Sequence, residues 1–174
     1  MKINIYGSTG EIGKTTLNLL ENNFSEIKIN LLCAKSNIKL LRKQIYKYKP
    51  KYAFLYDNEK KINIGKKIDK TKILNFNDLL IYLSSSKSTY SLLAISGYKS
   101  LYFLEHIIKN TDILGIASKE AIVSVGHIFN KKKYFNKTNI FPIDSEHYSL
   151  FDFFNKINKK NIKNITLTAS GGPF

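Results

Sequence analysis

The chain of 174 residues has little of several things that fix a protein's structure or its location. Its single cysteine, Cys33, rules out an internal disulfide framework and fits a reducing compartment. No apolar stretch approaches the roughly 20 residues of a membrane helix, and the sequence opens on a strand-like pattern without the apolar region of a signal peptide. We therefore expect a soluble, cytoplasmic protein with length enough for one ordinary domain, or for one domain and part of another.

Arginine is almost absent, since Arg42 is the only one beside 27 lysines. A net charge of +15 would suit a nucleic-acid partner, because clustered cations release counterions from a phosphate backbone. Recognition of bases and bidentate recognition of phosphates favour arginine, however, and lysine, isoleucine and asparagine together make 69 of the 174 residues, which is typical of an AT-rich coding sequence. We therefore expect no nucleic-acid partner, and a basic nucleic-acid-binding protein of the same fold stays an alternative.

Strand-like and helix-like segments alternate along the chain. Strand patterns cover residues 2–6, 27–34, 52–56, 73–75, 90–96 and 112–118. Helical patterns cover residues 14–21, 36–48, 78–84 and 99–109, whereas the polar stretch 57–72 suits a loop or an edge element. This alternation predicts an α/β fold with a Rossmann-like, doubly wound and mostly parallel sheet.

A glycine-rich loop, GSTGEIG at 7–13, follows the first predicted strand and opens a helix. At this position a dinucleotide pyrophosphate binds backbone N–H groups and the positive end of the helix dipole. Glycine is needed because a Cβ would block either the tight turn or the approach of the phosphate. The spacing G-x-x-G-x-x-G differs from the common G-x-G-x-x-G, so a glycine-rich turn that serves packing stays an alternative.

The stretch after the second predicted strand indicates which nucleotide the loop would hold. NAD sites usually carry an acid here, which holds the ribose 2′-hydroxyl. This chain has Lys35, Ser36 and Asn37 instead, and a cation with a hydroxyl suits a 2′-phosphate. NADPH is therefore the expected cofactor, the alternative being that Lys35 is one more lysine of a lysine-rich chain.

Two carboxylates, Asp144 and Glu146, follow the apolar run 139–143, with Ser145 between them. Open α/β sheets bind ligands at strand ends, and two hard oxygen donors at this spacing suit Mg²⁺ or Mn²⁺. A second role fits equally: Asp144 or Ser145 caps the following helix, and Glu146 lies in its first turn. His147 is expected to be a packed or surface residue, because hard cations prefer oxygen ligands.

Four motifs, in this order, resemble the 1-deoxy-D-xylulose 5-phosphate reductoisomerase family: GSTGEIG, ASKEAIVSVG at 117–126, PIDSEHYSLF at 142–151 and TASGGPF at 168–174. The family consists of NADPH- and metal-dependent oxidoreductases of non-mevalonate isoprenoid biosynthesis, and the resemblance covers the whole chain. It implies rearrangement of 1-deoxy-D-xylulose 5-phosphate by retro-aldol and aldol steps. NADPH then reduces the resulting aldehyde to 2-C-methyl-D-erythritol 4-phosphate.

The resemblance also implies roles for individual residues. The expected cofactor-binding residues are the loop glycines Gly7 and Gly13 together with Thr9, Gly10, Glu11, Ile12, Lys35, Ser36, Asn37, Ser118 and Glu120. Substrate binding falls on Lys119, Ser145, Glu146 and Ser170. The expected metal ligands are Asp144 and Glu146, and the expected catalytic residues are Asp144, Glu146 and Lys119. The expected ligands are NADPH, Mn²⁺ or Mg²⁺, and a phosphorylated sugar substrate.

Three places depart from the residues usual in the family. Glu11 replaces a small hydroxyl residue, and a carboxylate beside a pyrophosphate is repulsive unless it turns outward or pairs, for example with Lys14. Lys35 and Ser36 replace a glycine and a lysine, and Ser118 replaces an asparagine. These changes bear on the affinity for the cofactor and not on membership of the family.

The resemblance finally predicts how the chain is divided. Residues 1–143 are expected to form the NADPH-binding Rossmann-like domain, and residues 144–174 the beginning of an α+β catalytic domain. In the family, SGGPF leads into a lid, a histidine, further phosphate-binding residues and a third carboxylate for the metal, followed by a helical domain. We therefore expect an incomplete chain, inactive alone, that forms a homodimer or associates with the missing C-terminal portion. A residual NADPH-binding module without catalysis stays an alternative.

Overall fold

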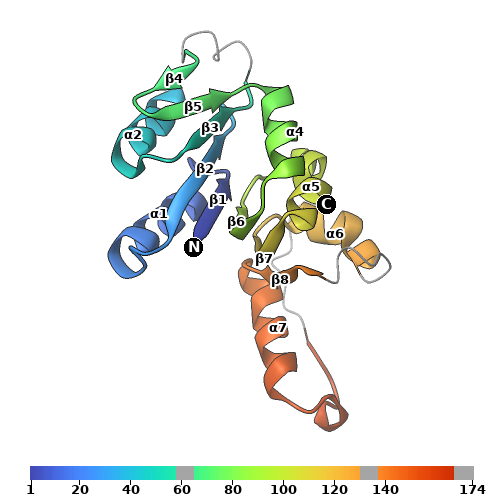
Figure 1. Ribbon diagram of the computed structural model, residues 1–174. Helices are drawn as coiled ribbons and strands as arrows, with labels where there is room; N and C mark the ends of the chain where they lie inside the picture. Colours follow the sequence, from blue (N-terminus) through green and yellow to red (C-terminus); the bar gives the residue numbers. More distant parts are fainter. Residues whose placement is uncertain (58–64, 130–136, 167–174) are drawn as a thin grey trace, which may run out of the picture.

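The computed structural model describes residues 1–57, 65–129 and 137–166 (Figure 1). In these residues eight strands form one sheet in the order β4-β5-β3-β2-β1-β6-β7-β8. The strands are β1 (Lys2–Tyr6), β2 (Lys28–Ala34), β3 (Tyr52–Leu55), β4 (Lys67–Ile68), β5 (Thr71–Leu74), β6 (Ser88–Leu93), β7 (Thr111–Ile116) and β8 (Asn139–Pro142). All neighbours pair in parallel except β4 and β5. The predicted Rossmann-like, mostly parallel α/β fold is therefore confirmed.

Helices connect the parallel strands. They are α1 (Glu11–Asn23), α2 (Ile38–Tyr48), α4 (Phe76–Ser85), α5 (Leu101–Lys109), α6 (Lys119–Phe129) and α7 (Ser145–Lys156), with short 3₁₀ turns η1 (Tyr98–Ser100) and η3 (Lys159–Asn161). The segments 14–21, 36–48, 78–84 and 99–109 that the sequence pattern predicts to be helical lie within or largely overlap α1, α2, α4 and α5 with η1. No pattern predicted α6, whose inward positions are Ala121, Ile122 and Val125.

The strand order reverses between β1 and β6. The chain adds β2 and β3 on one side of β1 and then crosses to pair β6 with its other side. In open α/β sheets such a reversal leaves a crevice at the carboxyl ends of the two strands, where ligands bind. The glycine-rich loop after β1 and the segment after β6 therefore meet at the place where the fold favours a ligand site.

Apolar side chains cover both faces of the sheet because neighbouring residues of a strand point to opposite sides. In β1, Ile5 packs among residues of α1 and α2, whereas Tyr6 packs among residues of α4, α5 and α6. In β2, Leu32 joins the first group and Leu31 the second. Burial of each such side chain contributes about 1.5–3 kcal/mol, so the two layers hold the strand ends in fixed positions.

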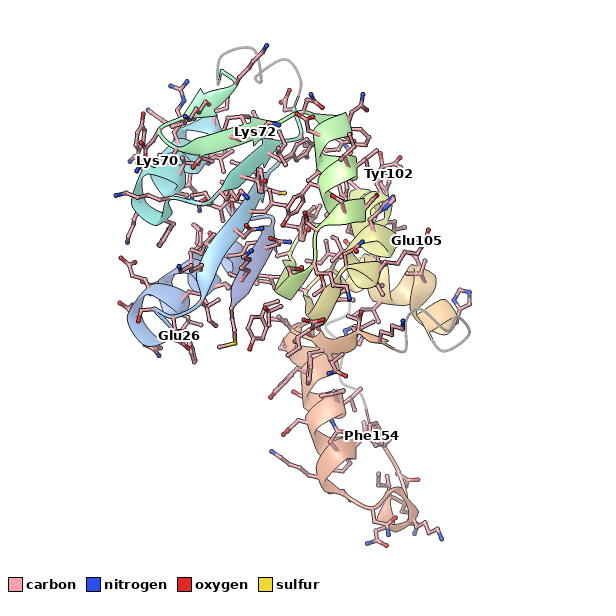
Figure 2. All side chains as sticks on the ribbon, viewed as in Figure 1. Glu26, Lys70, Lys72, Tyr102, Glu105 and Phe154 are labelled. Carbon is pink, nitrogen blue, oxygen red and sulfur yellow. The ribbon has the colours of Figure 1, made fainter. Side chains whose placement is uncertain are left out.

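Helix α7 lies apart from these layers. It contacts β8, projects away from the sheet in Figures 1 and 2, and buries none of its residues. Phe154, labelled in Figure 2, is one of its aromatic side chains. No helix among the residues that the structure describes combines the length and apolar character needed to span a bilayer.

Candidate functional site

The glycine-rich loop leaves β1 in a turn that only glycine fits. Gly7 has a φ of 99°, and its N–H and that of Ser8 both donate to the carbonyl oxygen of Cys33 at 2.9 Å. A Cβ on Gly7 would lie 2.3 Å from the carbonyl oxygen of Ala94, and one on Gly13 would lie 2.3 Å from that of Gly7. The first glycine therefore brings β1 against the end of β6, and the last brings α1 against the loop.

The N-terminus of α1 has no side-chain cap. Gly10 occupies the capping position, whereas Asn37, Asn75 and Asp144 cap α2, α4 and α7 by accepting hydrogen bonds from backbone N–H groups. The first turn of α1 therefore keeps N–H groups and the positive end of its dipole available to an anion. This matches what the sequence pattern predicts for a pyrophosphate site.

Gln44 of α2, which the sequence analysis missed, fixes the same loop. The Oγ of Ser8 donates to Oε1 of Gln44 at 2.8 Å, and Nε2 of Gln44 donates to the carbonyl oxygen of Ser8 at 2.7 Å. Both residues are buried. Two mutual hydrogen bonds in an apolar setting tie the loop to a helix 36 residues along the chain, and the local sequence carries no signal of this pairing.

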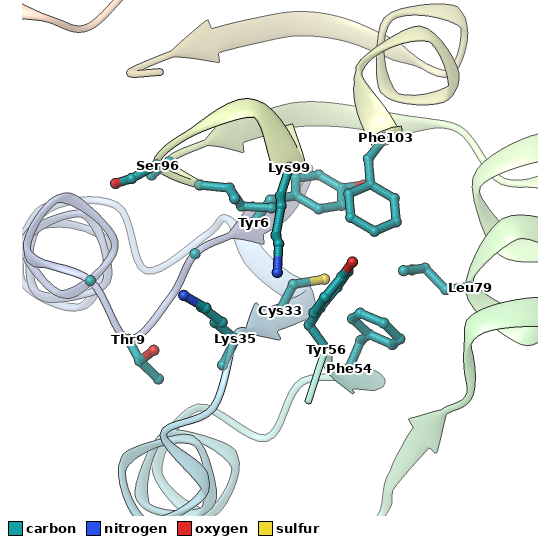
Figure 3. A pocket seen from close by; sticks show the side chains of 15 residues that line it. Tyr6, Thr9, Cys33, Lys35, Phe54, Tyr56, Leu79, Ser96, Lys99 and Phe103 are labelled. Carbon is teal, nitrogen blue, oxygen red and sulfur yellow. The ribbon is translucent and has the colours of Figure 1, made fainter. Parts of the chain in front are cut away.

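A pocket of about 360 Å³ opens beside the loop at the carboxyl ends of β1, β2, β3 and β6 (Figure 3). Four predicted cofactor residues line it: Gly7, Thr9, Gly10 and Lys35. Lys99, Phe103 and Tyr56 also line it and were not predicted. The structure therefore brings the glycine loop and the predicted 2′-phosphate lysine to one pocket.

The other residues predicted around the loop lie outside this lining. Asn37 accepts a hydrogen bond from the N–H of Leu40 at 3.0 Å and thus caps α2, and Ser36 is half-buried beside it. Ile12 is exposed on the first turn of α1. The carboxylate of Glu11 is 2.5 Å from Nζ of Lys14, the pairing that the sequence analysis considered.

Ser118 and Glu120 belong to a hydrogen-bonded cluster at the end of β7. The Oγ of buried Ser118 donates to Oε2 of Glu120 at 3.1 Å and lies 3.0 Å from Oγ of Ser100, which donates to the carbonyl oxygen of Gly97. The backbone N–H of Glu120 and the hydroxyl of Ser118 lower the pKa of the Glu120 carboxyl. The cluster holds the start of α6 to η1 with Glu120 ionised.

The predicted acidic site lies where α7 follows β8. Nζ of Lys119 is 3.3 Å from Oδ2 of Asp144 and 3.0 Å from Oε1 of Glu146. The Oγ of Ser145 donates to Oε2 of Glu146 at 2.7 Å; this bond and the Lys119 ammonium lower the pKa of the Glu146 carboxyl to about 2. Glu146 and Asp144 in turn raise the pKa of Lys119. Asp144, Ser145, Glu146 and Lys119 are thus brought together, whereas Ser170 lies outside the described residues.

The geometry of these acids fits a hard cation. The side chain of Asp144 is 1% exposed, and its Oδ2 accepts no hydrogen bond in the described residues although the Lys119 ammonium lies near it. Oδ2 and an oxygen of Glu146 converge on one positive charge, as two ligands of a cation do. No group of three or more His, Cys, Asp or Glu side chains that could hold a metal occurs in residues 1–57, 65–129 and 137–166.

A second cavity, of about 680 Å³, lies at the amino ends of β1, β2 and β3 and is lined by several lysines. Its lysines are Lys2, Lys28, Lys47, Lys49, Lys51 and Lys70. The carboxyl ends of α1 and α2 reach this cavity, and the free carbonyl groups of helix ends favour cations. Lys47 also pairs with Glu21 at 2.6 Å. Of these six lysines, Lys47 lies in the last turn of a helix, α2.

Comparison with known proteins gives one family. The model of 1-deoxy-D-xylulose 5-phosphate reductoisomerase matches residues 3–126, and the model of its C-terminal domain matches residues 140–174. The enzyme of that name from Thermodesulfovibrio yellowstonii is 36% identical over 99% of this chain and 46% of its own length. That from Aquifex aeolicus is 34% identical over 100% of this chain and 44% of its own. The chain thus spans about half the length of these relatives.

The solved structures show the same fold. The reductoisomerase from Zymomonas mobilis in complex with NADPH superposes with a TM-score of 0.77 at 24% identity, over 87% of this chain and 40% of that one. A structure of the same enzyme type in complex with magnesium has a TM-score of 0.74 at 25% identity, over 84% of this chain. The chain therefore belongs to the 1-deoxy-D-xylulose 5-phosphate reductoisomerase family, and its parallel sheet is the Rossmann-like, NADPH-binding region of that family.

Proposed function

We propose that the chain supplies the cofactor domain and the first part of the catalytic domain of an active reductoisomerase. The complete enzyme converts 1-deoxy-D-xylulose 5-phosphate and NADPH into 2-C-methyl-D-erythritol 4-phosphate and NADP⁺. The observation that carries this proposal is the convergence of Asp144 and Glu146 on the Lys119 ammonium, at 3.3 and 3.0 Å, at the carboxyl ends of β7 and β8. The cap of α7 uses only Oδ1 of Asp144, so Oδ2 stays available for a cation.

On the cofactor side, the uncapped first turn of α1 would bind the pyrophosphate of NADPH. Gly7 and Gly13 allow the close backbone packing that shapes the loop, and Gly7, Thr9 and Gly10 line the pocket. Lys35 and Ser36 would bind the 2′-phosphate, and Asn37 caps the helix that follows them. The roles of Glu11 and Ile12 would be confined to their backbone N–H groups, because the Glu11 carboxylate pairs with Lys14.

On the substrate side, Asp144 and Glu146 would hold Mn²⁺ or Mg²⁺. The cation would supply a positive charge that polarises the carbonyl and hydroxyl oxygens of the substrate. Ser145 donates a hydrogen bond to Glu146 and orients its carboxylate, which would accept hydrogen bonds from substrate hydroxyls. The Lys119 ammonium, released from the carboxylates when the cation binds, would donate to a substrate oxygen. Ser170 would bind near the substrate phosphate.

Ser118 and Glu120 would lie along the cofactor between the two sides. Their hydrogen bonds to each other and to η1 fix the end of β7, which lies between β6 and β8 in the sheet. We place the division between domains at residues 143 and 144, because β8 is the last strand of the sheet and α7 buries none of its residues. The substrate domain would be completed by a further C-terminal portion, in the same chain or in an associated one, and the active unit would be a homodimer or this association.

Reconstitution tests the proposal. The chain is joined in cis to the remaining C-terminal portion of the Thermodesulfovibrio yellowstonii relative, and NADPH oxidation is followed with 1-deoxy-D-xylulose 5-phosphate and Mn²⁺. We expect turnover by the joined protein and none by residues 1–174 alone, because substrate-orienting groups are missing from the latter. Asp144→Asn and Glu146→Gln should abolish turnover, whereas Asp152→Asn on the exposed side of α7 should not. Activity of the joined Asp144→Asn protein equal to the parent would overturn the assignment of these acids.

A further inference from the structure

A second lysine reaches the cofactor pocket from the side opposite to Lys35. Lys99 belongs to η1, which follows β6, whereas Lys35 follows β2. Figure 3 shows the side chains of both lysines in the lining of the pocket, with the ring of Tyr56 beside Lys99 and Lys35 on the side of Thr9. Among the residues that the structure describes, neither lysine forms a salt bridge with a carboxylate. Two unpaired cations that line one pocket are suited to an anionic group.

The ring of Tyr56 is held in place on two sides. The backbone N–H of Tyr56 donates to the carbonyl oxygen of Ala34 at 2.9 Å, so the backbone of Tyr56 continues β3 alongside β2. Its ring meets that of Phe103 edge to face, with centroids 6.5 Å apart and planes at 88°. Nζ of Lys99 lies 4.9 Å from the ring centroid of Tyr56, a cation–π distance that orders the Lys99 side chain over the pocket.

The rest of the pocket is apolar. Buried Cys33, Phe54, Leu79 and Phe103 form its floor, and burial raises the pKa of the Cys33 thiol, which stays uncharged. The pocket has an apolar floor, an aromatic wall and two cations at its mouth. It therefore fits a flat heteroaromatic base whose attached sugar carries a phosphate. The glycine loop at the start of α1 lines the same pocket through Gly7, Thr9 and Gly10, and Lys14, which follows the loop, is already paired with Glu11.

We propose that Lys99 gives this chain its preference for a 2′-phosphorylated nucleotide and that Tyr56 binds the adenine of that nucleotide. Tyr56 packs against the adenine ring, and Lys99 shares the 2′-phosphate with Lys35. This inference rests on the proposed binding of NADPH and adds to it two residues that lie far from the glycine loop in the sequence. The chain would thus offer two positive charges to one phosphate, Lys35 from the segment after β2 and Lys99 from the segment after β6.

Calorimetric titration of the 174-residue chain with four ligands tests the proposal: NADPH, NADH, adenosine 2′,5′-bisphosphate and AMP. Lys99→Met keeps the apolar stem and removes the charge. It should weaken NADPH and the bisphosphate at least about tenfold, as expected for a charged hydrogen bond, and leave NADH and AMP within about twofold. Lys99→Arg should restore NADPH binding. Tyr56→Leu should weaken all four ligands about fivefold, because each carries an adenine.

Lys87→Met is the matched control. Lys87 is an exposed lysine that precedes β6, whereas Lys99 follows it, so the same charge is removed at the other edge of the sheet. Binding by this variant should equal that of the parent. If the parent binds NADPH and Lys99→Met behaves like Lys87→Met, or weakens NADPH and NADH equally, the role of Lys99 is overturned while the proposed function stands. If the parent binds neither NADPH nor the bisphosphate, both proposals fall.

Discussion

Lys119 and Asp144 meet across the ends of neighbouring strands, with Nζ of Lys119 3.3 Å from Oδ2 of Asp144. The other oxygen of the carboxylate, Oδ1, accepts hydrogen bonds from the N–H groups of Glu146 at 3.2 Å and His147 at 3.5 Å. Sequence reasoning offered helix cap and cation ligand as alternative roles for this acid. In the structure Oδ1 caps the helix, and Oδ2 lies near the positive charge of Lys119. One carboxylate can therefore act as a helix cap and as a cation ligand.

The separate roles of the two carboxylate oxygens of Asp144 can be tested with two substitutions at this position. Asp144→Asn keeps an oxygen for the cap and loses the charge, so we expect Mn²⁺ binding to the 174-residue chain to weaken at least about tenfold. Asp144→Ala loses the cap as well and should have a free energy of unfolding about 1 kcal/mol below that of the Asn variant. Electron paramagnetic resonance titration measures the first effect and urea denaturation the second.

Asp152→Asn is the control for both measurements, since Asp152 lies on the same helix and pairs with Lys156 on its exposed side. It should bind Mn²⁺ like the parent. Equal Mn²⁺ affinity in Asp144→Asn and the parent would leave Asp144 with its capping role alone.

The close packing of the glycine-rich loop gives a second prediction. Gly7→Ala places a Cβ 2.3 Å from the carbonyl oxygen of Ala94, at a φ of 99° that disfavours other residues. We expect the free energy of unfolding to fall by about 2–4 kcal/mol and NADPH binding to be lost. Gly126→Ala is the contrasting change, because its Cβ would have its nearest contact, 3.8 Å, with a side-chain methyl of Ile122. In helix α6 it should raise stability by up to about 1 kcal/mol. Equal effects of the two substitutions in denaturation experiments would refute this account.

The sequence predicts the parts of the site that depend on local geometry. Where β1 turns into α1, the need for glycine follows from the turn itself, and the spacing of Asp144 and Glu146 follows from the start of a helix. Near-continuous apolar runs likewise predict which segments are strands, because a parallel strand is buried on both faces.

Contacts between distant segments could not be predicted. The helix containing Gln44 was expected, but which of its side chains would face Ser8 depends on how α2 packs against the sheet. Tyr56 follows β3 and Lys99 follows β6, and β2 and β1 lie between these two strands in the sheet. The contact of Tyr56 with Lys99 therefore depends on the strand order and on the long side chain of Lys99. Helix α6 was not predicted, although its sequence KEAIVSVGHIF is rich in apolar residues, because β-branched residues are common in it and it follows closely on β7.

The pairing of Gln44 with Ser8 leads to a third prediction. Gln44→Leu leaves the hydroxyl and the carbonyl oxygen of Ser8 buried without this partner, and each such group costs about 1–3 kcal/mol. We expect a loss of about 2–4 kcal/mol in urea denaturation, together with weaker NADPH binding because the loop is no longer held. Lys43→Leu, the same replacement at the exposed neighbouring position, should change stability by less than about 0.5 kcal/mol. If the two variants unfold alike, Gln44 does not hold the loop.

The pairing of Glu11 with Lys14 decides how far an acid at the cofactor loop hinders binding. The two side chains are 87% and 42% exposed and lie 2.5 Å apart, so their pairing weakens but does not remove the negative charge near the pyrophosphate position. Glu11→Ser should therefore raise the affinity for NADPH only about twofold at low salt. Lys14→Met, which leaves the carboxylate unpaired at the N-terminus of α1, should lower it about threefold, within the range expected for one charge at a helix end.

The double variant completes the cycle and separates repulsion from a direct contact of Lys14 with the phosphate. If Lys14 acts only by neutralising Glu11, Glu11→Ser with Lys14→Met should bind NADPH as tightly as Glu11→Ser alone. Both single effects should shrink toward the parent affinity in about 0.5 M salt, because exposed charges are screened over a few ångströms there. Lys14→Met binding as tightly as the parent at low salt would show that the Glu11 carboxylate points beyond the reach of the phosphates even without its partner.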